Sequence, residues 1–315
     1  MSLQTPQDQF IKVGQINTRF WALGDEGTTV VLVHGIGASV EDWIFNIHAL
    51  AEHHRVYAID LVGFGHSDKP SVEYTTSYEA QFVKDFMEAQ NIDHANLIGH
   101  SMGGGIALQF VIQFPHKVQK LVLVASAGLG KELYLPFRLC TLPLLGERLT
   151  RPSQKGTAQL LNDAVYDPAL VTDDWVELGY QLAVLPGAQG PILSALRSSC
   201  NLRGMRDDVV RDTVDNLANI TAPTLIIWGQ QDGLIPVAHA QAAAQGIPNS
   251  RLHVFDRCGH IPQREHADEF NALVLDFLAS EGKEEMPQTG HTAYYRKPKS
   301  KFRERESGSE KPQST

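Results

Sequence analysis

The sequence has little cysteine and no long apolar run. Only Cys140, Cys200 and Cys258 occur among its 315 residues, and no two of them form a CxxC pair. Such widely spaced thiols favour neither a disulfide framework nor a thiolate metal site, and they fit a reducing compartment. The first ten residues lack the basic and apolar segments of a signal peptide, and nowhere do about 18 consecutive apolar residues occur. We therefore expect a cytoplasmic protein without a transmembrane segment.

Basic charge and metal or cofactor motifs are also scarce. The chain has 27 Lys and Arg against 36 Asp and Glu, a net charge of −9, which disfavours nucleic acid as the partner of the folded body. Its 13 histidines form no HExxH or HxH group. No glycine-rich GxGxxG turn follows a predicted strand, and no phosphate-loop lysine is present. The sequence predicts neither a metal nor a cofactor.

The carboxyl-terminal segment differs in composition from the rest of the chain. Residues 281–315 are dominated by charged and small polar residues without apolar periodicity, so they cannot bury enough surface to fold, and we expect a disordered tail. Within it, His291 to Arg305 combines six basic residues with Tyr294, Tyr295 and Phe302. This composition permits contact with RNA or an anionic membrane, although a solvated tail is the favoured interpretation.

Apolar, β-branched runs alternate with helical patterns along the body. Thr76 and Glu79 suggest a capping box that opens a helix over Ser77 to Gln90, and Glu265 to Leu278 has one apolar face of helical period. Alternation of this kind predicts an α/β fold with a mostly parallel central sheet and helices on both faces. Strands are predicted over Thr29–Val33, Arg55–Ile59, Asn96–Ile98, Leu121–Val124, Thr224–Trp228 and Leu252–Phe255.

A stretch of proline-punctuated helical pattern interrupts this alternation. It runs over residues 128–216 and contains no convincing strand. The simplest layout is one core in two parts, residues 1–127 and 217–280, with a helical insertion between them.

Gly99 to Gly103 reads GHSMG and matches GxSxG between a predicted strand and a predicted helix. A serine at such a sharp turn sits in strained backbone, and the flanking glycines let neighbouring chain pass close to it. Ser101 is therefore the candidate nucleophile.

A serine hydroxyl needs a base, and the base needs a group that fixes its tautomer. Asp232 in GQQDG and His260 in RCGH each follow a predicted strand, at the sheet edge where ligands bind in α/β folds. Taken singly, Asp232 could shape a turn and His260 could cap the last helix. Together with Ser101 they indicate a Ser-His-Asp triad.

The first predicted strand runs into His34-Gly35-Ile36-Gly37. An oxyanion hole needs two backbone donors, and the glycines leave this backbone open to approach. The amides of Ile36 and Met102 are the candidates, while His34 more simply braces the loop.

These segments together resemble the α/β-hydrolase superfamily, in its lid-bearing serine hydrolase branch. This resemblance implies that Ser101 is the nucleophile, His260 the base and Asp232 its orienting group, with Ile36 and Met102 as oxyanion donors. It also implies that residues 128–216 form a lid and that Asp60 shapes the site wall. The matching motifs are HGIGAS at His34, DLVGFGHSDKP at Asp60, GHSMGG at Gly99, WGQQDGLIP at Trp228 and CGHIPQREHADEFN at Cys258.

The resemblance extends to hydrolases of meta-cleavage products, with two departures. Those enzymes usually have Asn before the nucleophile and Trp after the catalytic histidine, where this chain has His100 and Ile261. The departures favour hydrolysis of a small, mainly apolar carboxylic ester through an acyl-enzyme, with His100 as a substrate contact. Carbon-carbon hydrolysis of vinylogous diketones is the alternative, for which Arg197 could hold a substrate carboxylate. A non-catalytic ligand-binding receptor of the same fold is the alternative from another class.

Overall fold

An eight-stranded sheet forms the centre of the protein, whose computed structural model describes residues 4–280. The strand order is β1-β2-β4-β3-β5-β6-β9-β10. The pairs β1–β2 and β2–β4 are antiparallel, and every pair from β4 to β10 is parallel. The predicted fold class is confirmed. The strands are β1 (Gln9–Val13), β2 (Ile16–Leu23), β3 (Thr29–Val33), β4 (Arg55–Ile59), β5 (Ala95–His100), β6 (Val118–Val124), β9 (Thr224–Gly229) and β10 (Ser250–Phe255).

The sheet contains two strands that the sequence analysis did not predict. Strands β1 and β2 form an antiparallel hairpin at one edge, with Gly14 in its turn at φ 57°. Strand β2 buries two polar residues, Thr18 and Arg19, in its centre, which blurs the apolar pattern. Arg19 forms ion pairs there with Glu41 at 2.6 Å and Asp8 at 2.7 Å. The sequence signal was lost because a paired cation occupies a core position.

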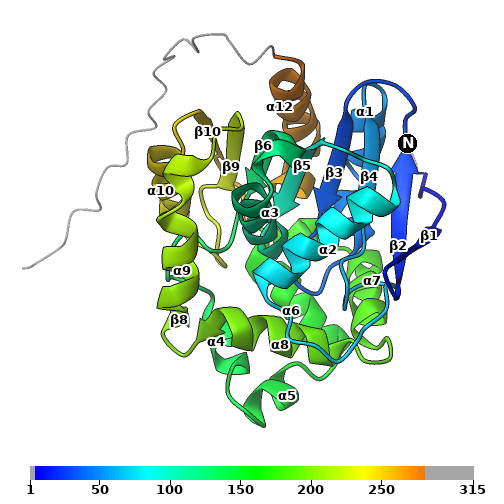
Figure 1. Cartoon of the computed structure of the whole chain (residues 1–315). Coiled ribbons are helices and arrows are strands. Elements are labelled where there is room, and N and C mark those ends of the chain that lie inside the picture. Colours follow the sequence, from blue (N-terminus) through cyan, green and yellow to red (C-terminus); the bar gives the residue numbers. More distant parts are fainter. Residues whose placement is uncertain (1–3, 281–315) are drawn as a thin grey trace, which may run out of the picture. The chain divides into compact units, whose positions relative to one another are not determined.

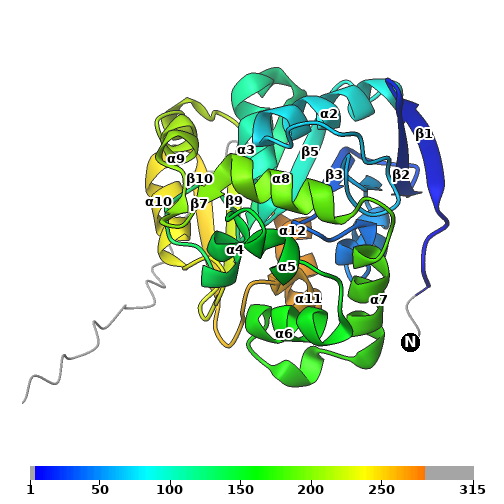
Figure 2. The same ribbon diagram turned by 90° about the horizontal axis from the view of Figure 1, so that it is seen from below.

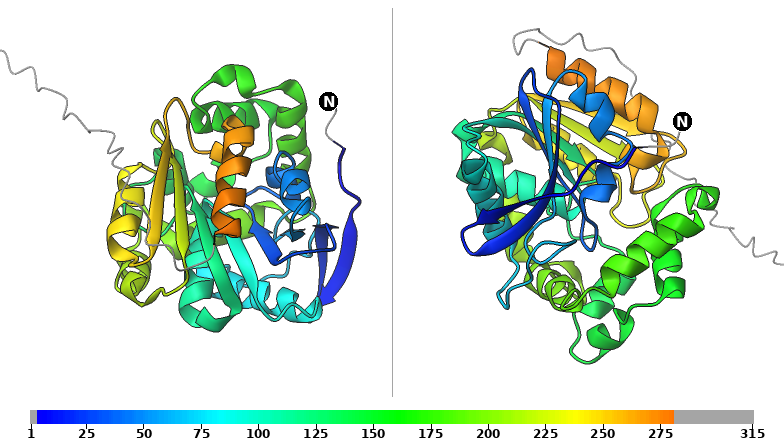
Figure 3. Two further views of the ribbon diagram at one scale, coloured as in Figure 1. Left: turned by 90° about the horizontal axis from the view of Figure 1, so that it is seen from above. Right: turned by 90° about the vertical axis from the view of Figure 1, so that its right-hand side faces the viewer.

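Helices cover both faces of the sheet, and each face has its own apolar core (Figure 3). Strand β3 shows the division, because Val31 and Val33 belong to one core while Val30 and Leu32 belong to the other. The continuous apolar run of β3 therefore contributes side chains to both cores, as in other sheets that are covered by helices on both faces. The helices of the main body are α1 (Ile47–Ala51), α2 (Thr76–Ala89), α3 (Met102–Gln113), α10 (Ala238–Gly246), α11 (Pro262–Glu265) and α12 (Ala267–Ala279), with short 3-10 helices at Val40–Trp43 and Pro115–Lys117. Two more 3-10 helices, Pro168–Leu170 and Leu217–Asn219, lie between β6 and β9.

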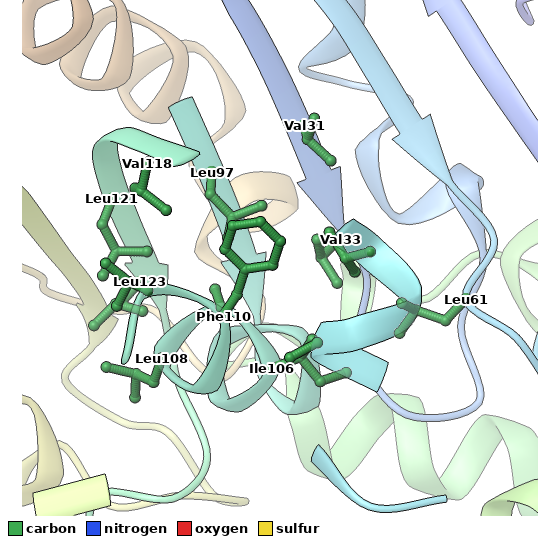
Figure 4. Close-up of a cluster of buried hydrophobic side chains, with 14 of the residues drawn as sticks. Val31, Val33, Leu61, Leu97, Ile106, Leu108, Phe110, Val118, Leu121 and Leu123 are labelled. Carbon is green, nitrogen blue, oxygen red and sulfur yellow. The ribbon is translucent and has the colours of Figure 1, made fainter. Parts of the chain in front are cut away.

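Helix α3 anchors one of the cores, because its apolar side chains pack on the inner strands (Figure 4). Ile106, Leu108 and Phe110 belong to the same cluster as Leu97 of β5 and Leu123 of β6. All five are at most 1% exposed. This packing fixes the first turn of α3 against the end of β5.

Helix α2 begins one residue earlier than the predicted capping box. Thr75 is its N-cap, and the Thr75 hydroxyl accepts a hydrogen bond from the amide of Tyr78 at 3.1 Å. Thr76 lies inside the helix, and Glu79 is buried instead of reaching back to the cap. The prediction that Thr76 and Glu79 form a capping box is therefore wrong.

The segment between β6 and β9, residues 125–223, is called here the insert. Helices α4 and α8 lie at the lower end of the molecule in Figure 1, and Figure 2 shows α8 crossing in front of the strands. The predicted boundaries at residues 128 and 216 fall inside the insert, which also holds one short hairpin that the sequence did not indicate. Its elements are α4 (Leu135–Cys140), α5 (Leu145–Leu149), α6 (Gln154–Ala164), α7 (Asp173–Ala183), α8 (Gln189–Ser199), β7 (Cys200–Asn201), β8 (Gly204–Met205) and α9 (Asp207–Val214).

All three cysteines are buried free thiols. Between residues 4 and 280, no helix combines the length and the apolar character needed to cross a membrane. The predicted disordered tail at 281–315 and its basic stretch lie outside the described residues.

Candidate active site

Ser101 occupies the turn between β5 and α3, with φ 54° and ψ −116°. A non-glycine residue at positive φ is strained, so the surrounding chain must hold it there. Two glycines make this possible. A Cβ at Gly99 would lie 2.2 Å from the carbonyl oxygen of Gly103, and one at Gly103 would lie 2.3 Å from that of Val33. The GxSxG motif thus has the steric role that its sequence context predicts.

The structure brings Ser101, His260 and Asp232 together from three different loops. Ser101 Oγ lies 2.9 Å from His260 Nε2, and His260 Nδ1 lies 2.8 Å from Asp232 Oδ2. The other carboxylate oxygen of Asp232 accepts hydrogen bonds from the amides of Leu234 at 2.8 Å and Ile235 at 2.9 Å. Because Asp232 accepts from Nδ1, the Nε2 lone pair of a neutral imidazole faces the serine hydroxyl.

The amides of Ile36 and Met102 belong to the two segments that flank Ser101. Met102 is the first residue of α3, so its N–H has no partner within the helix. Among the described residues, neither amide donates to a protein acceptor. Gly35, next to Ile36, lets its own segment lie close to Ser101, because a Cβ at Gly35 would stand 3.3 Å from the Cβ of Ser101.

His34 braces its loop, as expected from the sequence. Its Nδ1 lies 2.7 Å from the carbonyl oxygen of Gly35, and its Nε2 accepts the amide of Leu61 at 3.1 Å. Burial lowers the pKa of His34 despite the hydrogen bond to Gly35, so the ring is neutral. Asp60 is also structural, since its carboxylate accepts from the amides of Val40 at 2.8 Å and His66 at 2.7 Å.

His100 has both ring nitrogens engaged inside the protein. Nδ1 lies 2.8 Å from Asp42 Oδ2, and Nε2 lies 3.0 Å from the carbonyl oxygen of His260. Burial alone would lower the pKa of His100, but the Asp42 carboxylate and the His260 carbonyl hold it above its usual value. Both partners are acceptors, so the ring is a buried imidazolium. His100 lines the wider cavity at Ser101, so the predicted substrate contact stays a prediction, although both ring nitrogens are already bound within the protein.

Arg197 lies away from Ser101, in contrast to its predicted role. Its guanidinium pairs with Glu147 at 2.9 Å and donates to the carbonyl oxygens of Thr141 and Leu142, both at 3.4 Å. It lines neither of the cavities that contain Ser101. The prediction of Arg197 as a substrate-binding residue is wrong, because the side chain ties α8 to α5 and to the loop before it.

Two cavities meet at Ser101. The narrow cavity, of about 60 Å³, lies among α2, α3, α8 and the β7–β8 hairpin. The wide cavity, of about 230 Å³, lies among the loop of residues 35–42, α6 and α7. Both have Ile36, Ser101, Phe137 and His260 in their walls, and no lysine or arginine lines either of them in the part of the chain that is described. The site therefore offers two mainly apolar arms, and the charge of His100 in the wall of the wide cavity is already paired with Asp42.

Sequence reasoning missed two acidic residues at this site. Asp42 holds the His100 ring and also accepts a hydrogen bond from Gln263 at 3.2 Å. Glu79 lines the narrow cavity. The only local signal at Glu79 was its spacing from a threonine, which suggested a cap, and nothing near Asp42 in the sequence marks its partners. In residues 4–280, no group of three or more His, Cys, Asp or Glu residues is placed to hold a metal ion.

Comparison with known proteins identifies the family. Residues 28–267 match the model of the alpha/beta hydrolase fold family. A 2-hydroxy-6-oxo-6-phenylhexa-2,4-dienoate hydrolase of Burkholderia cepacia is 35% identical over 265 residues, which cover 81% of this chain and 89% of that protein. The chain belongs to the α/β-hydrolase fold family, and the predicted family is confirmed.

Solved structures agree with this assignment. A meta-cleavage product hydrolase variant from Pseudomonas fluorescens IP01, in complex with acetates, has a TM-score of 0.73 at 28% identity and covers 86% of this chain and 96% of its own. A membrane phospholipase A described as a bacterial virulence factor has a TM-score of 0.72 at 25% identity, with coverages of 86% and 85%. The neighbours thus include a meta-cleavage product hydrolase and a phospholipase A.

Proposed function

We propose that this protein is a serine hydrolase that cleaves a small, mainly apolar carboxylic ester through an acyl-enzyme. The observation that carries the proposal is the hydrogen-bonded chain from Ser101 through His260 to Asp232, at the meeting point of two cavities whose walls hold no unpaired cation. An uncharged substrate with two apolar arms matches these walls, and its scissile carbonyl would sit at the junction.

The chemistry uses groups that already face one another. Ser101 Oγ attacks the acyl carbon while His260 Nε2 takes the hydroxyl proton, and Asp232 stabilises the imidazolium that forms. The amides of Ile36 and Met102 donate to the oxyanion. His260 then gives its proton to the leaving alcohol. In the second half His260 takes a proton from the water that attacks the acyl carbon, and it returns this proton to Ser101 Oγ as the bond to the acyl group breaks and the acid leaves.

The insert serves as a lid in this proposal. Its helices supply walls to both cavities, through Leu196 of α8 for the narrow cavity and Trp175 of α7 for the wide one. An apolar cover over Ser101 excludes bulk water, which strengthens the electrostatic contacts to the oxyanion. The predicted lid boundaries at residues 128 and 216 remain part of this proposal.

Carbon-carbon hydrolysis of a meta-cleavage-type vinylogous diketone is the second candidate. It is favoured by the names of relatives from Burkholderia cepacia and Comamonas testosteroni, at 35% and 34% identity. Such a substrate carries a carboxylate, which needs a positive partner when buried. Arg197 pairs with Glu147, and the charge of His100 is taken up by Asp42, so the cavity walls favour the ester.

A competition between the two substrate types tests the choice. We expect kcat/KM for the best short-chain p-nitrophenyl ester to exceed that for a meta-cleavage dienoate by at least about tenfold, because no unpaired cation offsets the buried carboxylate of the dienoate. Arg197→Ala, a control for the predicted carboxylate contact, should leave both values unchanged. The reverse preference, with loss of dienoate turnover alone in Arg197→Ala, would establish the second candidate.

Labelling with a fluorophosphonate separates both enzymes from a ligand-binding receptor. The reagent reacts with an activated serine, so wild type should be labelled and Ser101→Ala should not. An unlabelled wild-type protein that still binds apolar esters would be a receptor.

A further inference from the structure

Glu79 is a buried acid on α2 with no protein partner at either carboxyl oxygen. The residue is 2% exposed, and within residues 4–280 neither Oε1 nor Oε2 makes a hydrogen bond. Buried polar atoms are almost always paired, so an orphaned carboxyl needs an explanation. Its position supplies one, because Glu79 lines the narrow cavity that also contains Ser101 and His260.

The surroundings keep this carboxyl uncharged. Burial raises the pKa of Glu79 well above its usual value, and no cation offsets the effect. The titratable neighbours are the phenols of Tyr74 and Tyr78, whose own pKa values are raised by burial and then by the nearby Glu79. The Tyr74 hydroxyl is already used, since it donates to the carbonyl oxygen of Pro70 at 2.7 Å. Glu79 therefore presents one O–H donor and one carbonyl acceptor.

We propose that the narrow cavity is a specificity subsite for a substrate arm that ends in a hydroxyl group, which pairs with the carboxyl of Glu79. This proposal rests on the proposed function, in which Ser101 cleaves the bond at the cavity junction. A hydroxyl both donates and accepts, so it satisfies both orphaned oxygens without bringing a charge into an apolar space. The rest of the arm contacts apolar wall residues such as Ile106 and Leu196.

Charged arm ends match this cavity less well. A carboxylate would meet Glu79 without any lysine or arginine in the wall. An ammonium could ionise Glu79, but both charges would then be removed from water in a space whose other walls are mainly apolar, which is costly. A methyl end leaves the Glu79 carboxyl without a partner. The geometry thus ranks the hydroxyl first.

The test compares esters of equal chain length that end in hydroxyl or methyl, with the variable end placed on the acyl arm in one series and on the alcohol arm in another. Wild type should prefer the hydroxyl end by about 10- to 100-fold in kcat/KM in one series, since a site that pairs with a hydroxyl rejects analogues without it. Glu79→Gln, which keeps a donor and an acceptor, should retain most of this preference. Glu79→Leu should reverse it.

Glu88 offers a matched control on the same helix, because its side chain is 51% exposed and pairs with Lys84 at the surface. Glu88→Gln should leave the hydroxyl preference as in wild type. A wild-type protein that shows no preference in either series, or a preference that survives in Glu79→Leu, would overturn the proposal. Better turnover of ammonium-ended or carboxylate-ended esters than of the hydroxyl-ended ester would overturn it as well.

A binding experiment separates the subsite from the proposed chemistry. Calorimetry on Ser101→Ala protein compares amide analogues of these esters, of equal length, that end in hydroxyl or methyl. The hydroxyl-ended amide should bind at least about tenfold more tightly than the methyl-ended amide. The difference should vanish when Glu79→Leu is added. If this difference is found while wild type cleaves no ester, the subsite stands and the ester proposal fails. If the two amides bind equally well while wild type cleaves esters, the subsite proposal fails and the ester hydrolase proposal stands.

Discussion

His100 Nε2 donates a hydrogen bond to the backbone carbonyl of His260 at 3.0 Å, so the residue before Ser101 holds the chain at His260. The two imidazole rings lie 5.0 Å apart, centroid to centroid. Asp42 fixes the other nitrogen of His100 at 2.8 Å, and the positive charge of His100 outweighs burial and lowers the pKa of Asp42. His100, at the end of β5, therefore joins Asp42 through a buried ion pair and the loop of His260 through a hydrogen bond.

The first prediction concerns this tie. His100→Phe removes the hydrogen bond to His260 and leaves Asp42 buried without its cation. Because small displacements of a catalytic group reduce turnover strongly, kcat should fall by about 10- to 100-fold with little change in KM. His100→Asn keeps a donor and should recover part of kcat. Steady-state kinetics check this, and a rise in KM alone would mean that His100 contacts substrate after all.

The turn at Ser101 gives a second prediction. Gly103→Ala would place a Cβ 2.3 Å from the carbonyl oxygen of Val33 and 2.6 Å from that of His34. Overpacking of this kind should lower the free energy of unfolding by about 1–3 kcal/mol and displace Ser101. Urea denaturation measures the first effect and ester kinetics the second.

Gly190 of α8 is the control for Gly103. No atom lies within 4 Å of a Cβ built there. Gly190→Ala should therefore raise the stability, by up to about 1 kcal/mol, because alanine favours the helix. If both variants were equally tolerated, the close approach at Gly103 would be relaxed in solution.

Glu79 gives a prediction for the pH dependence of stability. Burial raises its pKa in the folded protein, whereas in the unfolded chain it ionises near pH 4.3. The folded state therefore binds more protons than the unfolded state between these two pKa values. The stability that Glu79 contributes is fully present below about pH 4.3, and it is lost as the pH rises toward the pKa of the folded state. Relative to Glu79→Gln, wild type should lose at most about 1.4 kcal/mol per pH unit. Urea titrations of both proteins at several pH values measure the difference. A relative gain for wild type would mean that Glu79 is ionised and paired.

The sequence was sufficient to predict the parts of the fold that depend on local pattern. The parallel strands from Thr29 onward are short apolar runs between turn residues, and all six predicted runs are strands in the structure. The GxSxG turn was found because its glycines are required by close approaches that any such turn makes. The hairpin of β1 and β2 escaped because its buried Arg19 depends on carboxylates at positions 8 and 41.

Side-chain partners across the chain could not be predicted in the same way. Arg197 was assigned to substrate, but its partner Glu147 lies 50 residues earlier and comes near it only after the insert folds. For Glu79 the error was to assign a local role, as part of a helix cap, to a side chain that turns into the protein. Its spacing from Thr76 suggested a cap, whereas the true cap at Thr75 frees the side chain to turn inward.

The central claim is that Ser101 forms an acyl-enzyme during ester hydrolysis. Rapid mixing of wild type with a p-nitrophenyl ester, followed by acid quench and mass spectrometry, tests it most directly. For wild type, the account predicts a burst of p-nitrophenol or steady turnover, with an acyl adduct on Ser101. In His260→Gln this adduct should accumulate wherever the variant still acylates. The account also predicts that Ser101→Ala loses roughly 10⁴ to 10⁶ in kcat, since the members of a triad act as a unit. Ester turnover above a tenth of wild type in Ser101→Ala, or an adduct on another residue, would contradict it.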